Sequence, residues 1–378
     1  MKAVLNKTRP MPAGCYLELT PHCQNRCIGC FNVWKITQTK HVPSSPLSGE
    51  AWLGLVKDLA NISIKYCVLT GGEPTLHQDF TEIIRGIDQL GITTYLLTNG
   101  MWNKPSLIVD TLTNLRHFGS MTISLHGATP QSHEKYTHKQ GSFDTTVQNI
   151  RLATSRGIVV FLSFVITPWN LNEIAAVFDL SQELGCSGVV YNRYMGPHMV
   201  ELDVDENLLR KAILDVEKIK YRNGHVKFGN CMPQCFSINS SRICGAATSF
   251  FVVDPWGNMR PCGHSSLQVG NLISDSLENL WYDSRLVEWR AHIPEMCNEC
   301  AVVKLCGGGC RALAEIRGYD PMYQKPFNLL NFAYVSLLFT YRVGGLFGLF
   351  RKPLQKASNT LCKQVQRAIP LPIFKSRS

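Results

Sequence analysis

The sequence predicts an α/β fold in which an incomplete (β/α)6 barrel of the TIM type is followed by a small cysteine-rich domain with a β-hairpin and short helices. Two observations carry this prediction. Short apolar runs alternate with longer helical patterns from residue 14 to about residue 194, and cysteines gather farther along, between Cys231 and Cys310. Strand–helix repeats of this kind form parallel sheets with right-handed crossovers. Six repeats, where a complete barrel has eight, leave the barrel open on one side.

The expected strands are short apolar runs bounded by turn residues. They lie at residues 15–19, 66–70, 94–98, 121–125, 159–166 and 188–194. Amphipathic stretches between them predict helices, for example at 48–59, 79–90 and 143–156. Beyond the barrel, the runs 250–253 and 259–262 flank the turn Asp254-Pro-Trp-Gly257, which predicts a β-hairpin. We therefore expect the barrel at 13–215, the cysteine-rich domain at 216–320 and a C-terminal tail at 321–378.

Cysteine content and charge narrow the class of protein. The N-terminus lacks the basic, apolar and small-residue order of a signal peptide, so a cytoplasmic protein is expected. In that reducing compartment, 15 cysteines that are mostly clustered indicate metal ligands and not disulfides. The net charge of +10 belongs mainly to the tail, where eight Lys and Arg and no acidic residue follow residue 325. The body therefore has no basic groove, and a nucleic-acid partner is not expected.

Three cysteines follow the first expected strand with the spacing Cys-x3-Cys-x2-Cys, namely Cys23, Cys27 and Cys30. A [4Fe–4S] cluster takes four thiolates. Three thiolates on one loop therefore hold three irons and leave the fourth iron open to a substrate or cofactor. A structural zinc site instead closes its coordination with four ligands. The spacing favours the cluster, with zinc and unligated thiols as the alternatives.

The other candidate site residues follow the carboxyl ends of the strands, where parallel α/β folds place their working residues. They are Gly71, Gly72, Glu73, Thr98, Asn99, Ser124, His126, Val165, Ile166, Asn170 and Arg193. The adjacent glycines let a backbone carbonyl approach a ligand closely, and the carboxylate of Glu73 accepts from an ammonium group. The alternatives are a tight turn for the glycines, a helix cap for Ser124 and a turn for Asn170.

The cysteine loop and the Gly-Gly-Glu segment together make the chain resemble radical S-adenosylmethionine (SAM) enzymes. The resemblance implies that the amino and carboxylate groups of SAM chelate the open iron and that residues 71–73 hold the amine. It also implies a ribose contact at Ser124 and an adenine contact near Val165 and Ile166. Reductive cleavage of SAM would give a 5′-deoxyadenosyl radical that abstracts a hydrogen atom from the substrate. The protein would position the reactants and exclude water.

Three positions depart from the family pattern. Many relatives carry an aromatic residue just before the third cysteine, where this chain has Gly29. A backbone contact to adenine survives that change, whereas ring stacking does not. Relatives often have Tyr-Arg where this chain has Tyr136-Thr137, so Lys139 or Arg193 is the candidate for the missing charge near the SAM carboxylate. His126 stands where relatives often carry Asp.

A second cysteine array resembles the SPASM extension of radical enzymes that modify peptides, which holds two auxiliary clusters. Its spacing is Cys244-x12-Gly257-x4-Cys262, then Cys297-x2-Cys300-x5-Cys306-x3-Cys310. The resemblance assigns Cys244, Cys262 and Cys310 to the first auxiliary cluster, with Cys231 or Cys235 as the fourth ligand. Of these two we favour Cys235.

The second auxiliary cluster would take Cys297, Cys300 and Cys306, but the family's fourth cysteine, soon after the array, is missing. The sequence offers Cys362 in the tail, a group other than cysteine, or an open iron. Together with the SAM-binding cluster, the resemblance implies three [4Fe–4S] clusters. A pair of zinc sites is the alternative for the array.

The tail begins with the largely apolar stretch 328–350, followed by basic residues in 351–378. Its length approaches that of a membrane span, but polar residues and Gly344-Gly345 interrupt it. We expect a helix packed against the body. Contact with a membrane surface or a partner, and a true span, are the alternatives.

The leading hypothesis is a radical SAM maturase that acts on a ribosomally synthesised precursor peptide, leading to a crosslink, rearrangement, backbone excision or epimerisation. Such relatives recognise a leader through a winged-helix module, for which a barrel beginning near residue 14 leaves no room. A separate leader-recognition protein is therefore expected, with flavodoxin or ferredoxin as the electron donor. The alternatives are an anaerobic sulfatase maturase, which typically carries Asp where this chain has Gly263, and a zinc-binding interaction protein.

Overall fold

The computed structural model describes residues 10–36, 45–62, 64–223, 225–236, 244–318 and residue 337. The chain divides into two compact units, Met1–Pro326 and Phe327–Ser378. Apart from residue 337, the second unit lies outside the described residues, and so do the predictions for the stretch 328–350 and for Cys362.

Six parallel strands form the body of the first unit. They are β1 (Gly14–Glu18), β2 (Tyr66–Thr70), β3 (Thr93–Thr98), β4 (Phe118–Ser124), β5 (Val160–Ile166) and β6 (Gly188–Arg193). Neighbours in the chain are neighbours in the sheet, and each pair is parallel. This order confirms the predicted incomplete barrel. A short seventh strand that the sequence did not reveal, β7 (Val226–Phe228), pairs in parallel with β6.

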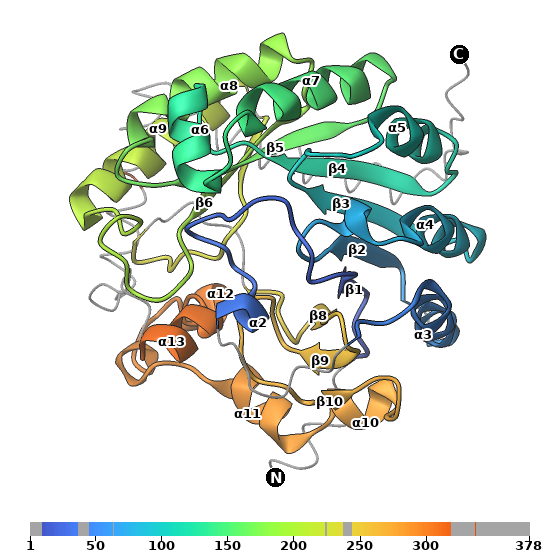
Figure 1. Ribbon diagram of the computed structural model, residues 1–378. Helices are drawn as coiled ribbons and strands as arrows, with labels where there is room; N and C mark the ends of the chain where they lie inside the picture. Colours follow the sequence, from blue (N-terminus) through green and yellow to red (C-terminus); the bar gives the residue numbers. More distant parts are fainter. Residues whose placement is uncertain are drawn as a thin grey trace, which may run out of the picture. The chain divides into compact units, whose positions relative to one another are not determined.

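Helices connect the strands. They are α3 (Gly49–Asn61), α4 (Phe80–Gln89), α5 (Pro105–Thr113), α6 (Pro130–Thr137), α7 (Ser142–Ser155), α8 (Ile174–Glu183) and α9 (Glu206–Asn223). In α4 the buried residues Phe80, Ile83, Ile84 and Ile87 make one apolar face, the pattern of a helix that packs on a sheet. Figure 1 shows α3, α4, α5, α7 and α8 along the outer side of the curved sheet. The carboxyl ends of the strands are therefore left to the loops.

The cysteine-rich segment begins with the predicted hairpin. Its strands β8 (Phe250–Val253) and β9 (Asn258–Arg260) are antiparallel, and β10 (Gly270–Asn271) pairs with β9. Short helices follow: α10 (Leu277–Trp281), α11 (Ser284–Ala291), η3 (Glu295–Cys297), α12 (Val303–Cys306) and α13 (Arg311–Arg317). The sequence did not reveal that β8 pairs in parallel with β1. The hairpin therefore continues the barrel sheet, in the order β10-β9-β8-β1-β2-β3-β4-β5-β6-β7.

One apolar core runs from the barrel into the cysteine-rich segment. Leu17 of β1, Phe251 of β8 and Trp281 of α10 are fully buried in the same cluster. The rings of Phe251 and Trp281 meet edge to face, with their centroids 6.4 Å apart. The predicted domain boundary at 215/216 falls inside α9, and the division of the chain into domains remains a prediction.

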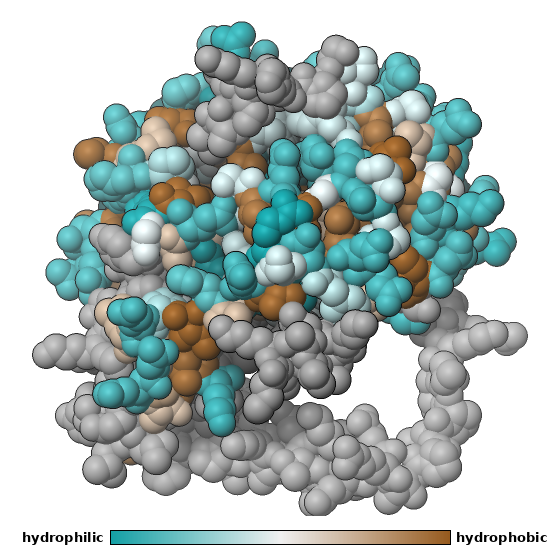
Figure 2. Space-filling model, turned by 90° about the horizontal axis from the view of Figure 1, so that it is seen from below, coloured by the Kyte–Doolittle hydropathy of each residue, from teal (hydrophilic) through white to brown (hydrophobic). Residues whose placement is uncertain are grey.

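The face drawn in Figure 2 carries hydrophilic side chains interspersed with small apolar groups, as is usual for protein surfaces. Within the residues that the structure describes, no helix combines the length and the apolar character needed to cross a membrane.

Candidate active site

The three-cysteine loop after β1 lies on the loop that follows β2. The N–H of Gly72 donates to the carbonyl of Thr20 at 2.7 Å, and that of Glu73 donates to His22 at 2.7 Å. A Cβ added at Gly72 would lie 2.1 Å from the His22 carbonyl oxygen, far inside van der Waals contact. Gly71 has a φ of +137°, which only glycine adopts readily, and its Cβ would lie 2.7 Å from Thr20 O. The glycine pair is therefore required by the cysteine loop itself.

Glu73 is fully buried and braces the ends of two strands. Its Oε1 accepts from the hydroxyls of Thr75 at 2.6 Å and Thr98 at 2.8 Å, and its Oε2 accepts from the N–H of Asn99 at 2.8 Å. Burial raises the pKa of this carboxyl group, and the hydrogen bonds from Thr75, Asn99 and Thr98 act against that shift. The expected donor to Glu73 was a ligand amine, whereas the structure provides several protein donors.

Asn99 links the end of β3 to the cysteine loop. Its side-chain N–H donates to Cys23 Sγ at 3.4 Å, and its Oδ1 accepts from the N–H of Met101 at 2.7 Å. Hydrogen bonds to sulfur are among the groups that set the reduction potential of an iron–sulfur cluster. Asn99 is therefore placed to orient and tune the first of the three thiolates.

The far side of the cysteine loop lies against the C-terminal end of α6. The N–H groups of Arg26 and Ile28 donate to the carbonyls of Thr137 and Tyr136, at 2.9 and 3.0 Å. The Tyr136 hydroxyl donates to the Gly29 carbonyl at 3.0 Å, and a Cβ at Gly29 would lie 2.4 Å from the hydroxyl oxygen. The missing aromatic side chain at Gly29 is thus explained, because Tyr136 occupies the adjacent space.

Replacement of Gly29 by Phe tests this arrangement. We expect the Gly29→Phe variant to lose about 1–3 kcal/mol of stability through overpacking and to retain less iron after anaerobic reconstitution. The thermal unfolding midpoint and the iron content would measure both effects. Adding Tyr136→Ala should restore part of the loss because it vacates the space. A Gly29→Phe protein as stable as the wild type would contradict the contact with Tyr136.

His126 is part of a buried bridge between the ends of β4 and β5. Its Nδ1 accepts from the N–H of Val165 at 3.3 Å, and Asn170 Nδ2 donates to the carbonyls of His126 and Val165 at 2.9 and 2.8 Å. Burial, and secondarily His133, holds the pKa of His126 well below its usual value. His126 is therefore neutral near pH 7 and carries its proton on Nε2. A neutral imidazole stands where relatives often have a carboxylate.

The remaining strand-end residues take different places. Ser124 is partly buried beside Ser163 of the next strand, and Ile166 is buried in the core. Arg193, at the end of β6, donates through Nη2 to the carbonyl of Cys231 at 2.9 Å. Lys139 is exposed. Of the two candidates for the missing charge, Arg193 is therefore bound to the segment of the second cysteine array, and Lys139 lies on the surface.

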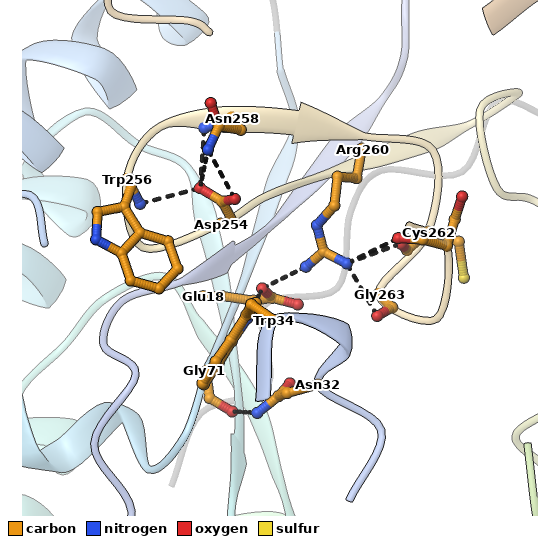
Figure 3. A network of polar contacts seen from close by, with 11 residues as sticks. Glu18, Asn32, Trp34, Gly71, Asp254, Trp256, Asn258, Arg260, Cys262 and Gly263 are labelled. Atoms are coloured by element: carbon orange, nitrogen blue, oxygen red, sulfur yellow. Dashed lines mark hydrogen bonds and ion pairs between the residues drawn. The ribbon is translucent and has the colours of Figure 1, made fainter. Parts of the chain in front are cut away.

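A buried ion pair that sequence reasoning missed joins the barrel to the hairpin (Figure 3). Arg260 of β9 contacts Glu18 of β1, Nη2 to Oε2, at 2.5 Å, and both side chains are at most 1% exposed. Trp34, in the short helix α2 (Val33–Ile36), donates through Nε1 to the same oxygen at 2.7 Å. Arg260 Nη1 donates to the carbonyls of Gly263 and Ser265, both at 3.1 Å. One guanidinium therefore positions the loop that carries Cys262.

The signal for this pair was a charged residue inside an apolar strand, β1. Glu18 interrupts an apolar run, and an ion there is retained inside a fold only when it is paired. Burial raises the pKa of Glu18, with Arg260 as the largest opposing influence. Among the described residues, Glu18 Oε1 has no hydrogen-bond partner, and it would lie 3.6 Å from a Cβ at Gly263.

The cysteines after the barrel fall into two neighbouring groups. Cys231, Cys244, Cys262 and Cys310 form the first group, and Cys235, Cys297, Cys300 and Cys306 form the second. From the sequence, Cys235 was favoured as the fourth cysteine of the first group. In the structure Cys231 lies with that group, and Cys235 lies with the second. The cysteines of the described residues form no disulfide. Within the same residues, no three His, Cys, Asp or Glu side chains stand in a geometry that would hold a single metal ion. The donor chemistry of three thiols on one loop and two groups of four fits iron–sulfur clusters.

Comparisons with known proteins agree with this geometry. Residues 17–181 match the radical SAM superfamily, and residues 244–301 match SPASM, an iron–sulfur cluster-binding domain. The AdoMet-dependent heme synthase of Methanosarcina barkeri is 23% identical over 342 residues, which are 82% of this chain and 94% of that protein. The PqqA peptide cyclase of Rhizobium meliloti is 24% identical over 334 residues, which are 83% of this chain and 86% of that protein.

A solved structure shows the same fold. Streptococcus suis SuiB bound to S-adenosylmethionine matches with a TM-score of 0.68 and 17% identity, over 86% of this chain and 78% of that one. SuiB bound to its precursor peptide SuiA matches with a TM-score of 0.65 and 17% identity, over 85% of this chain and 74% of that one. The chain is therefore an enzyme that contains a radical SAM domain over residues 17–181 and, after it, a SPASM iron–sulfur cluster-binding domain over residues 244–301.

Proposed function

We propose that this enzyme abstracts a hydrogen atom from a ribosomally synthesised precursor peptide and thereby starts a crosslink, rearrangement, backbone excision or epimerisation. The observation that carries the proposal is the docking of the three-cysteine loop on the Gly71–Glu73 segment at the carboxyl ends of β1, β2 and β3. When bound there, SAM and its cluster supply the 5′-deoxyadenosyl radical. A peptide substrate is supported by the similarity to PqqA peptide cyclase, which extends over most of the chain.

The chain's own residues would position the reactants and exclude water. Asn32 Nδ2 donates to the Gly71 carbonyl at 2.7 Å, which fixes the glycine loop beneath the cysteine loop. Asn99 donates to Cys23. The ring of Tyr136 lies against His126, with the ring centroids 4.0 Å apart, and both side chains are buried. These two rings would form a dry wall beside the cysteines, which protects a radical from side reactions.

The enzyme would need an electron donor. Reductive cleavage of SAM takes one electron, for which flavodoxin or ferredoxin is the expected donor. Two auxiliary clusters in the SPASM domain, a separate leader-recognition protein and a cytoplasmic location complete the proposal.

A second candidate reaction is the synthesis of heme, because the M. barkeri heme synthase matches 82% of this chain. The sulfatase-maturase alternative is less well supported, because this chain lacks the expected catalytic base. The base that such enzymes carry after the cysteine would stand at Gly263, and the nearest carboxylate, that of Glu18, is held by Arg260.

The experiment is anaerobic incubation of the reconstituted enzyme with SAM, a reductant and the precursor peptide encoded nearby, followed by mass spectrometry. We expect 5′-deoxyadenosine and a changed peptide mass, with hydrogen lost from the peptide recovered in 5′-deoxyadenosine when the peptide is deuterated. The control omits SAM. If 5′-deoxyadenosine forms, the peptide is unchanged and a porphyrin substrate is converted, the peptide reaction is rejected and heme synthesis is supported. Absence of 5′-deoxyadenosine from the fully loaded enzyme would refute both.

A further inference from the structure

Four cysteines from two separate segments line one cavity in the SPASM domain. The thiols of this cavity are Cys235, Cys297, Cys300 and Cys306. Much of the remaining lining is apolar, with side chains such as Pro233, Met296, Val302 and Val303. A pocket with thiols on several sides and an apolar wall suits a buried iron–sulfur cluster.

The segment that carries Cys235 is attached to the array by its backbone. The N–H of Gln234 donates to Cys306 Sγ at 3.3 Å, so the chain next to Cys235 lies on the end of α12. Phe236 closes a turn by donating its N–H to the Pro233 carbonyl at 3.0 Å. Arg210 of α9 donates to the Phe236 carbonyl at 3.0 Å and stacks over the Phe236 ring at 4.1 Å. These contacts hold Cys235 at the cavity from a second direction.

Cys231, four residues earlier, is held on the other side of the turn. Its thiol donates to the carbonyl of Gly309 at 3.3 Å, next to Cys310. Its carbonyl accepts from Arg193 at 2.9 Å. These contacts place Cys231 beside Cys310, with the first group of cysteines.

The mutual influence of the thiols gives the same grouping. Burial and, after it, the neighbouring thiols Cys235, Cys306 and Cys300 together raise the pKa of Cys297 to about 11. Burial raises the pKa of Cys262 most, and the thiols of Cys244 and Cys310 are the next largest causes of that shift. The two groups adjoin at Cys306. This thiol also raises the pKa of Cys231, but less than burial, Cys244 and Cys310 do.

We propose that Cys235 is the fourth ligand of the second auxiliary cluster, so that an upstream residue replaces the downstream cysteine that this chain lacks. Cys231 then completes the first auxiliary cluster, and the proposal requires no ligand from the tail. The inference rests on the proposed presence of two auxiliary clusters. A cluster closed by four thiolates has no open iron, so the peptide does not bind to it. The second auxiliary site then serves structure or electron transfer.

The test uses the full chain with Cys23, Cys27 and Cys30 replaced by Ala, so that only the auxiliary clusters remain after anaerobic reconstitution. Electron paramagnetic resonance (EPR) of the reduced protein is recorded in this background. Cys300→Ala and Cys244→Ala identify the signals of the second and first cluster. Cys235→Ala is expected to lose or change the signal that Cys300→Ala affects, with up to about four fewer irons per chain. Cys231→Ala should act on the signal that Cys244→Ala affects.

Two controls match these variants. Cys186→Ala removes a buried thiol on the barrel side, and it should leave both signals unchanged, as should Cys362→Ala. Cys235→Ser keeps a ligand atom and should shift the signal where the Ala variant abolishes it, which separates ligation from misfolding. The inference is overturned if Cys235→Ala spares the second signal, if it changes the first signal, or if Cys362→Ala removes the second. The proposed function fails separately, when the wild type forms no 5′-deoxyadenosine.

Discussion

Gly72→Ala is expected to reduce 5′-deoxyadenosine formation by about 10²-fold or more, the loss that follows when reacting groups are displaced by about an ångström. The added methyl group would lie 2.1 Å from the carbonyl oxygen of His22, in the loop that carries the three cysteines. Because that contact is with backbone, the loop has to move away from β2. The same move breaks the hydrogen bonds from Gly72 to Thr20 and from Glu73 to His22.

The measurement is 5′-deoxyadenosine per enzyme under reducing conditions, with iron content determined on the same sample. Gly54→Ala is the matched control, because Gly54 is exposed in α3 and a Cβ there meets nothing within 4 Å. Alanine favours a helix interior over glycine by about 1 kcal/mol, so the control should be unchanged or slightly more stable. Full activity in Gly72→Ala would show that the cysteine loop does not rest on this glycine.

Arg260→Met is expected to cost about 3–5 kcal/mol of stability near neutral pH, as when one partner of a buried ion pair is removed. The reason is the carboxylate of Glu18, which stays fully buried and loses its cation. Chemical unfolding under anaerobic conditions would measure the loss. Adding Glu18→Gln should recover most of it, because the amide is neutral and still accepts from Trp34. Arg156→Met, at a half-exposed pair with Asp110, should cost less than about 1 kcal/mol.

The Arg260→Met protein also has an expected pH dependence. Burial raises the pKa of Glu18 above its value in the unfolded chain, and Arg260 opposes that shift. Without Arg260 the folded pKa rises further, so the folded state binds a proton more readily than the unfolded state. The free energy of unfolding of the variant, relative to wild type, should therefore recover as the pH falls through the folded pKa. A deficit that stays constant with pH would mean that Glu18 is not the source of the loss.

The strand order of the barrel was predictable from the sequence because each strand is a local apolar run and each connection is a local helix. The hairpin was predictable from the turn sequence at Asp254–Gly257. The pairing of β8 with β1 was not, because it joins segments that are far apart in the chain and carry no local signal of their partner. β7 escaped because three residues are too short to show a period.

For the site, spacing located the cysteines but not their grouping. Cys231 and Cys235 lie four residues apart in one segment, and only the turn at Pro233–Phe236 sends them to different groups. Gly29 departed from the family pattern for a reason located in α6, where Tyr136 fills the space. For Gly29 the missing information was a contact with a distant segment, and for the two cysteines it was a local turn together with contacts to the distant residues Gly309 and Cys306.

β1 pairs with β2 on one edge and with β8 on the other, and this affects how the chain folds during synthesis. Synthesis delivers β1 and β2 early, but β8 emerges only after the whole barrel has been translated. One edge of the strand that leads into Cys23 therefore stays unpaired during most of translation, and exposed edges of this kind invite aggregation. Closure of that edge has a high contact order and is intrinsically slow. The native surroundings of the three-cysteine loop are thus completed only when the hairpin arrives, which ties maturation of the first cluster site to the late appearance of the SPASM domain.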